Sequence, residues 1–291
     1  MGITINSRIL LSVAAIAAAA ALIVGATFAF FSDSETSEGN VFASGSLDLK
    51  VDSEAHYAGL VCSSENIWVL EATVTSRPDL EGDSCDGTWA QTDLGPENKF
   101  FNLSDIKPGD SGEDTISLHV VDNDAWGRLV ISSVDDLENG CGGAESSVDA
   151  DCASNSDGEL RDNLQFSIWL DEGSTSGFQG QQDEGEGDNI RQENEPILVT
   201  EGTVDSIGET HNIWEGLAVA YGLDGCIGDG TSSSDCPGLA SDGRLVGSIT
   251  YYFGIDWTLP DTVGNEVQTD SLGADITIDA VQHRNNPGQV F

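Results

Sequence analysis

Apolar and polar residues alternate along several stretches of the chain, and this alternation predicts β-strands. The longest stretch runs from Ile249 to Leu259, where every second residue is large and apolar. Shorter alternating stretches cover residues 47–51, 116–120 and 276–278. Because successive side chains of a strand point to opposite faces, a period of two places one apolar face against a core. We therefore expect a strand in each of these ranges.

Further strands are predicted at residues 67–75, 128–133, 164–170 and 197–200, which are rich in β-branched and aromatic residues. After residue 30 we find no long helical period. Residues 135–160 and 172–195 are rich in Asp, Glu, Gly, Ser, Asn and Gln, and we expect them to be solvated surface loops. The pattern predicts an all-β fold: an antiparallel, jelly-roll-like β-sandwich with long acidic loops, formed as one domain by residues 47–291.

The N-terminus has the pattern of an export signal. Arg8 precedes an apolar, alanine-rich run from Ile9 to Gly25, which predicts a hydrophobic signal helix within residues 1–29. Small residues follow it, so we expect cleavage after Ala29, leaving Phe30 as the mature N-terminus. The expected location is extracellular or at the cell surface, with membrane contact only during export. An uncleaved membrane anchor is the alternative; an archaeal-type pilin would need a short basic leader cut before the apolar run, and we see none.

Charge sets this chain apart from most secreted proteins. It has 51 Asp and Glu against 10 Lys and Arg, for a net charge of −41 over 291 residues. Such a chain is unsuited to nucleic acid, whose phosphates need a basic surface. Molar salt shortens the Debye length to about 3 Å and screens the self-repulsion. The composition therefore indicates adaptation to high salt, with an acidic calcium-binding or acidic-tail protein as the alternative.

Six cysteines suggest an oxidising compartment. They allow fifteen pairings. The pairing of neighbours is favoured, since each pair brackets a Gly-, Asp- or Ser-rich loop. The expected pairs are Cys62 with Cys85, Cys141 with Cys152, and Cys226 with Cys236.

Four segments carry a resemblance to a known family. They are Gly25-Ala-Thr-Phe-Ala-Phe-Phe-Ser-Asp-Ser-Glu-Thr-Ser, Asn40-Val-Phe-Ala-Ser-Gly-Ser-Leu-Asp-Leu-Lys-Val-Asp, Ile106-Lys-Pro-Gly-Asp-Ser and Trp257-Thr-Leu-Pro-Asp-Thr-Val-Gly-Asn-Glu-Val-Gln-Thr-Asp-Ser. The first three resemble the start and a strand-leading turn of the TasA/camelysin family. The last is similar to the closing segment of its halophilic archaeal branch.

This resemblance implies export through a SipW-type signal peptidase and assembly into a pilus-like or biofilm-matrix filament. The chain would form a head-to-tail homopolymer by donor-strand complementation. In that interpretation residues 30–46 are a donor strand and its tether, and Phe30, Phe31, Ser32 and Asp33 enter the next subunit. A frayed terminus is the alternative for this segment.

Chemistry in the remaining residues is sparse. The family's other name implies a metallopeptidase, but His56, His119, His211 and His283 are widely spaced, and we predict no enzyme, catalytic residue, metal site or cofactor. Asp122-Asn-Asp124 is more typical of a polar turn than of a calcium site. Asn102 begins the one glycosylation sequon. The rival functions are a monomeric secreted module that binds polysaccharide or divalent cations, and a metal-dependent peptidase.

Overall fold

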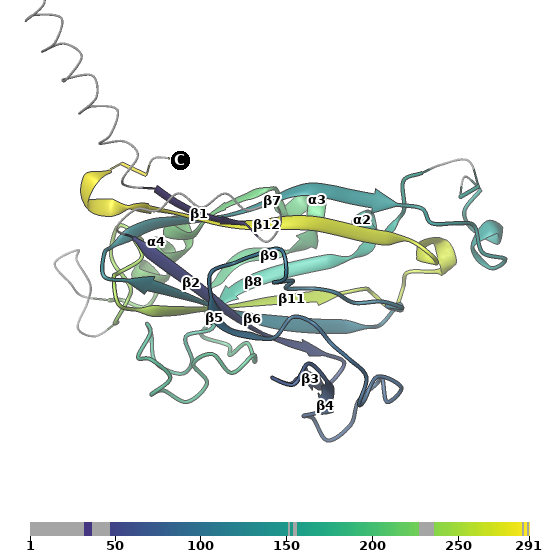
Figure 1. Cartoon of the computed structure of the whole chain (residues 1–291), viewed down its shortest axis with the longest axis horizontal. Coiled ribbons are helices and arrows are strands. Elements are labelled where there is room, and N and C mark those ends of the chain that lie inside the picture. Colours follow the sequence, from purple (N-terminus) through teal and green to yellow (C-terminus); the bar gives the residue numbers. More distant parts are fainter. Residues whose placement is uncertain are drawn as a thin grey trace, which may run out of the picture.

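The computed structural model describes residues 32–36, 47–150, 152–153, 156–226, 236–286, 288–289 and 291. It is mostly β, with 37% strand and 12% helix. Two sheets lie one above the other as the layers of a sandwich (Figure 1), and each strand pairing within them is antiparallel. The predicted all-β sandwich is therefore confirmed; the predicted signal helix lies outside the described residues.

The larger sheet has eight strands and forms the lower layer of Figure 1. Its order is β4-β3-β2-β6-β11-β8-β9, and β5 also pairs with β2. These strands are β2 (Asp48–Tyr57), β3 (Leu60–Cys62), β4 (Trp68–Leu70), β5 (Trp89–Thr92), β6 (Ser111–Val121), β8 (Gln165–Leu170), β9 (Ile197–Thr203) and β11 (Thr250–Thr258). The central strands are those whose alternation is clearest in the sequence.

The smaller sheet has four strands in the order β1-β12-β7-β10. They are β1 (Ser32–Thr36), β7 (Ala125–Leu137), β10 (Thr210–Asn212) and β12 (Ser271–Gln282). The β7–β12 pair is the longest pairing in this sheet, and a bulge between Gly273 and Asp275 interrupts its register. β1 and β10 are therefore the two edges of the smaller sheet.

One apolar core lies between the sheets. Leu49 and Val51 of β2 and Leu118 of β6 meet Ile278 and Ala280 of β12 in a single cluster, and each is at most 3% exposed. A second cluster surrounds Tyr57, Trp257 and the Cys62–Cys85 disulfide. Burial of alternate residues on each strand explains why the period of two predicts these strands.

A helix occurs where the sequence analysis found none. α4 (Ile213–Leu223) follows β10 directly and buries Ile213, Leu217 and Ala220, at positions i, i+4 and i+7. Its apolar residues continue around the helix, because Val219 and Leu223 are 56% and 72% exposed. The helical period is thus present but masked by apolar residues on the outer face. The shorter helical turns are η1 (Glu145–Ser147), α2 (Leu160–Asn163), α3 (Val204–Ile207), η2 (Asn265–Val267) and η3 (His283–Asn285).

The strand predicted at residues 67–75 is mostly wrong. Only Trp68–Leu70 form a strand, and the chain then continues as a loop up to β5. Val74 is 79% exposed, so the β-branched residues that suggested a strand have no core to cover. β-propensity in this segment is outweighed by the lack of a partner strand.

The two acidic loops are only partly solvated, which corrects the expectation from composition. In the first loop, β7 extends to Leu137, and Glu145 is fully buried. In the second loop Glu172, Phe178 and Glu195 are each at most 3% exposed. Backbone amides bind these carboxylates: Gly177 donates to Glu172 at 2.8 Å and Gly173 donates to Glu195 at 2.8 Å. Buried acids therefore organise a loop that has few apolar side chains.

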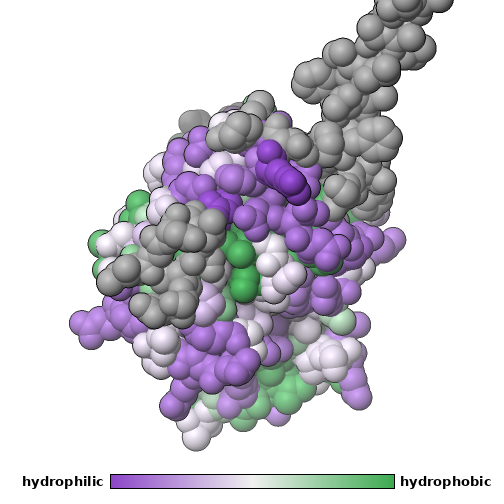
Figure 2. Space-filling view, turned by 90° about the vertical axis from the view of Figure 1, so that its left-hand side faces the viewer, coloured by the Kyte–Doolittle hydropathy of each residue, from purple (hydrophilic) through white to green (hydrophobic). Residues whose placement is uncertain are grey.

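The end of the molecule that Figure 2 shows is mostly hydrophilic. Figure 2 views the end of the molecule that carries α4 and shows small, separate hydrophobic areas among hydrophilic residues. In the part of the chain that the structure describes, no helix has the length and apolar character needed to cross a membrane.

Candidate functional site

The feature of greatest functional interest is the edge strand β1. It pairs antiparallel with β12 through five residue pairs, from Ser32 opposite Val281 to Thr36 opposite Thr277. A five-residue edge strand has a partner on one side only, so it can be exchanged without disturbing the sheet behind it. Ten residues, 37–46, separate β1 from the first described residue of the sandwich, Leu47.

β12 is held firmly from its other side. β7 pairs with it over its whole length, and Arg128 of β7 forms an ion pair with Asp279 at 2.8 Å. Ile278 and Ala280 are 3% and 0% exposed and anchor its inner face in the core. The edge that receives β1 is therefore built mainly by contacts that do not involve β1.

The predicted donor residues divide between two groups. Ala29, Phe30 and Phe31 lie outside the described residues. Ser32 and Asp33 lie in β1, opposite Val281 and Ala280 of the same chain. The receiving edge, residues 277–281, could not be predicted, because strand order across a sheet has no local signal in the sequence.

The turn that resembles the family pattern has a definite structural role. Asp110 accepts hydrogen bonds from the Lys107 amide at 2.8 Å and from the Tyr57 hydroxyl at 2.6 Å. Gly109 has φ +91°, a conformation that favours glycine. The Arg77 guanidinium lies 3.3 Å from the same Asp110 oxygen. The turn is thus fixed by a buried ion pair where β6 begins.

The remaining predicted residues lie at several separate places. Three disulfides join cysteines that are neighbours along the chain: Cys62–Cys85, Cys141–Cys152 and Cys226–Cys236. Asn102 is exposed, and its amide donates to Asp86 at 2.5 Å.

The four histidines are not brought together. His56 lies 3.0 Å from Glu71, and His119 lies 2.5 Å from Asp52. His211 contacts the Gly208 carbonyl and His283 lies 3.4 Å from Asp242. Among the described residues, the groups of three or more side chains near enough to share a metal ion are all carboxylates, grouped around Glu138.

Two acids of β6 lie near His56: Glu113 is opposite it in the β2–β6 register, and Asp114 is the next residue. Burial raises the pKa of Glu113 to about 10, and repulsion by Asp114 adds to the rise. Burial also lowers the pKa of His56, although Glu71 and Glu54 oppose that shift. At neutral pH this arrangement favours a protonated Glu113 beside a neutral histidine, which suits a hydrogen-bonded structural contact.

Comparison with known proteins finds a similarity at the N-terminus. The family model described as camelysin metallo-endopeptidase matches residues 4–58. Over this N-terminal segment the chain is similar to the camelysin/TasA family. Members of the camelysin/TasA family are typically secreted. A comparison with curated proteins finds no match for the chain.

The description of the camelysin model implies a catalytic metal, and the side chains in the described ranges do not fit one. Within residues 4–58 the histidine is His56. Neither it nor any other histidine of the described ranges belongs to a group that could share an ion. A catalytic zinc needs about three converging protein ligands, usually including histidine, with one open position. No hydrolytic step therefore follows from this arrangement.

Proposed function

We propose that this chain is a non-enzymatic structural subunit of an extracellular filament, in which β1 of one copy pairs with β12 of the next. The observation that carries the proposal is the five-residue pairing of β1 on the edge of the smaller sheet, with a ten-residue segment between it and the sandwich. Export through a SipW-type signal peptidase would free this segment at Phe30. Biofilm matrix and pilus-like fibre are the roles that such a polymer would serve.

Strand exchange changes the partner of β1 but keeps its bonding. The five residue pairs that close a single chain can form in the same register between two chains. Closed and exchanged forms therefore differ little in contact energy, and the balance depends on protein concentration and on the tether. Ten residues reach at most about 35 Å, so the acceptor β12 must lie within that distance of the donor's Leu47.

The surface favours this mode of assembly over simple hydrophobic contact. A net charge of −41 opposes face-to-face association of copies, and the hydrophobic areas in Figure 2 are small. Main-chain hydrogen bonds along a strand edge do not need an apolar surface. A donated strand also leaves the two bodies separated by a tether, which reduces their mutual repulsion.

Cysteine cross-linking between single variants tests the proposal. Thr36→Cys and Thr277→Cys change two residues that face each other in the β1–β12 register. We would mix the two mature single variants in molar salt, allow exchange, oxidise mildly and run a non-reducing gel. Strand exchange predicts a disulfide between different chains, which gives a dimer on the gel, and threads in electron micrographs of the concentrated protein.

A control variant places the second cysteine on the other sheet. Thr200 is exposed on β9, which is one of the two edge strands in the order of the larger sheet. Thr200→Cys mixed with Thr36→Cys should give no specific cross-link. If the Thr36→Cys and Thr277→Cys mixture also stays uncross-linked at high concentration, while the double variant closes within single chains, exchange is ruled out.

That last outcome would support a second function, a monomeric secreted module. The pairing of β1 with its own β12 favours it, because a self-completed edge resists polymerisation. A peptidase is addressed separately by zinc analysis and by hydrolysis of casein, where our proposal predicts neither bound zinc nor activity.

A further inference from the structure

Five carboxylates gather at the end of the sandwich where β7 ends and β12 begins. They come from residues distant in sequence: Glu138 follows β7, Glu145 begins η1, Asp149 follows η1, Glu159 precedes α2 and Asp270 precedes β12. We call these five residues the acidic cluster. Figure 1 places η1 and η2 at the end of the molecule opposite α4.

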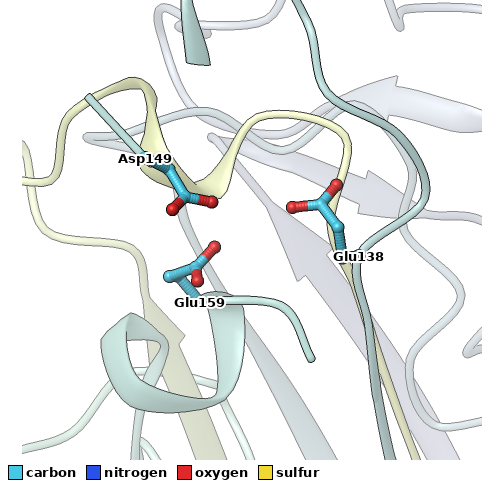
Figure 3. Close-up of side chains that lie close together, drawn as sticks. All are labelled: Glu138, Asp149 and Glu159. Carbon is cyan, nitrogen blue, oxygen red and sulfur yellow. The ribbon is translucent and has the colours of Figure 1, made fainter. Parts of the chain in front are cut away.

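The spacing of the acidic cluster matches a hard divalent cation. Ligand atoms of Glu138, Asp149 and Glu159 all lie within 4.8 Å of one another, and Figure 3 shows these side chains converging. The same holds for Glu138, Glu145 and Asp270. Two oxygens on opposite sides of a calcium ion are about 4.6–5.2 Å apart. Glu138 is common to both groups and stands between them.

Four residues of the acidic cluster carry buried oxygens without a hydrogen-bond partner. Glu145 is 0% exposed; one of its oxygens accepts the Gly142 amide at 2.7 Å, while its Oε1 has no hydrogen-bond partner. Buried oxygens of Glu138, Glu159 and Asp270 also lack a partner. A buried carboxylate oxygen without a partner is costly, so several in one place indicate a missing positive ligand.

The electrostatic setting agrees with this. Burial raises the pKa of Glu159 to about 7, and the charged neighbours that add to the shift are all acidic: Asp270, Asp149, Glu138 and Asp136. Burial likewise raises the pKa of Asp270 to about 6, with repulsion from Glu138, Glu145 and Asp136. A bound divalent cation would reverse both shifts.

Local structure holds the ligands in place. The Cys141–Cys152 disulfide closes the loop that carries Glu145 and Asp149. Asp270 accepts the Glu159 amide at 2.6 Å, which fixes the start of α2 against the turn before β12. The Thr269 hydroxyl donates to the Gly140 carbonyl at 2.7 Å. The acidic cluster is therefore held by a disulfide and by hydrogen bonds between its loops.

We infer that the acidic cluster binds calcium and thereby fastens the 138–159 loop to the end of the β7–β12 pair. Calcium takes six to eight oxygen ligands in a flexible geometry, which an all-carboxylate cluster of five residues can supply together with water. Magnesium requires shorter bonds and near-octahedral order, and zinc favours nitrogen and sulfur. The site lies outside residues 4–58 and is independent of any peptidase chemistry.

The test is a calcium titration of the mature protein in molar KCl after treatment with EDTA. Isothermal calorimetry gives affinity and stoichiometry, and thermal unfolding gives the stabilisation. Glu145→Gln keeps the shape of the side chain and one acceptor for the Gly142 amide but removes a charge. We expect calcium to raise the unfolding temperature of the unchanged protein, and Glu145→Gln to weaken calcium binding by roughly tenfold or more.

The metal-free proteins provide the check on folding. Because Glu145→Gln removes like-charge repulsion, its unfolding temperature in EDTA should equal or exceed that of the unchanged protein. Glu97→Gln removes the same charge at an exposed position outside the cluster and should keep the full calcium response. If calcium stabilises Glu145→Gln as much as the unchanged protein, or if magnesium acts as strongly as calcium, the inferred site is wrong.

Discussion

At the scale of single residues, the most consequential buried charge is Arg77. Its side chain is 6% exposed, and it donates to the Tyr57 hydroxyl at 2.5 Å and to the Asp105 carbonyl at 3.0 Å. It also neutralises Asp110, the carboxylate that holds the turn before β6. Removing one partner of a buried ion pair leaves the other charge uncompensated.

We therefore expect Arg77→Ala to lower the free energy of unfolding by about 3–5 kcal/mol. Arg161→Ala is the matched control, since its ion pair with Asp205 lies at the surface and should contribute less than about 1 kcal/mol. Denaturant unfolding in molar salt measures both. Equal losses of unfolding free energy in the two variants would show that the buried Arg77 ion pair contributes no more to stability than a surface ion pair.

Glu195 makes stability depend on pH. Burial raises its pKa to about 7, with repulsion from Asp171 and Asp188, although the Gly173 and Gln192 amides oppose the rise. The folded chain then holds the proton more tightly than the unfolded chain. The free energy of unfolding should fall as pH rises from about 4.5 to 7, by at most about 3 kcal/mol from this residue.

Glu195→Gln should remove this part of the pH dependence. We would compare unfolding at pH values below and above this window, in EDTA, for Glu195→Gln and for the exposed control Glu193→Gln. The control should keep the slope of the unchanged protein. A slope that is identical in both variants would mean that Glu195 titrates like an exposed acid.

At the scale of elements, β8 and β11 show how the larger sheet is packed. Gly254 of β11 lies directly opposite Trp169 of β8, and a Cβ atom built on Gly254 would lie within about 2.0 Å of the indole. Trp169 is 2% exposed and has little room to move. The tryptophan thus covers the space that a side chain at residue 254 would occupy.

Gly254→Ala should lower the free energy of unfolding by about 1–3 kcal/mol through overpacking. Gly273→Ala in β12 is the control, because no atom lies within 4 Å of its built Cβ. Thermal unfolding and tryptophan fluorescence would report both the loss and the movement of Trp169. A Gly254→Ala protein as stable as Gly273→Ala would contradict this description of the sheet.

The elements that could be predicted are long strands in which every second residue is buried. Alternation over residues 249–259 predicts β11 because its inward residues are buried one after another: Tyr251, Phe253 and Ile255 in the first cluster and Trp257 in the second. α4 was not predicted, because the exposed apolar residues Val219 and Leu223 hide its helical period. The buried acids of the long loops were not predicted either, because composition does not reveal which carboxylates accept hydrogen bonds from backbone amides. The acidic cluster escaped for another reason: Glu138 and Asp270 meet only through the pairing of β7 with β12.

At the scale of the whole molecule, the net charge of −41 dominates. We expect the unfolding temperature to rise steeply between about 0.1 M and molar KCl, because the Debye length shortens from about 10 Å to about 3 Å. Sucrose at matched osmolality is the control, since it favours the compact state without screening charge. Equal stabilisation by sucrose would show that repulsion between the acidic residues does not set the stability at low salt.

β1 and β12 run along the longest axis of the molecule in Figure 1. If a neighbouring copy supplied β1, tension along that axis would load the five residue pairs side by side, in shear. All of their hydrogen bonds would have to break together, whereas a sideways pull would open them one at a time. A thread joined in this way resists stretching far better than peeling, although each joint is only one short strand.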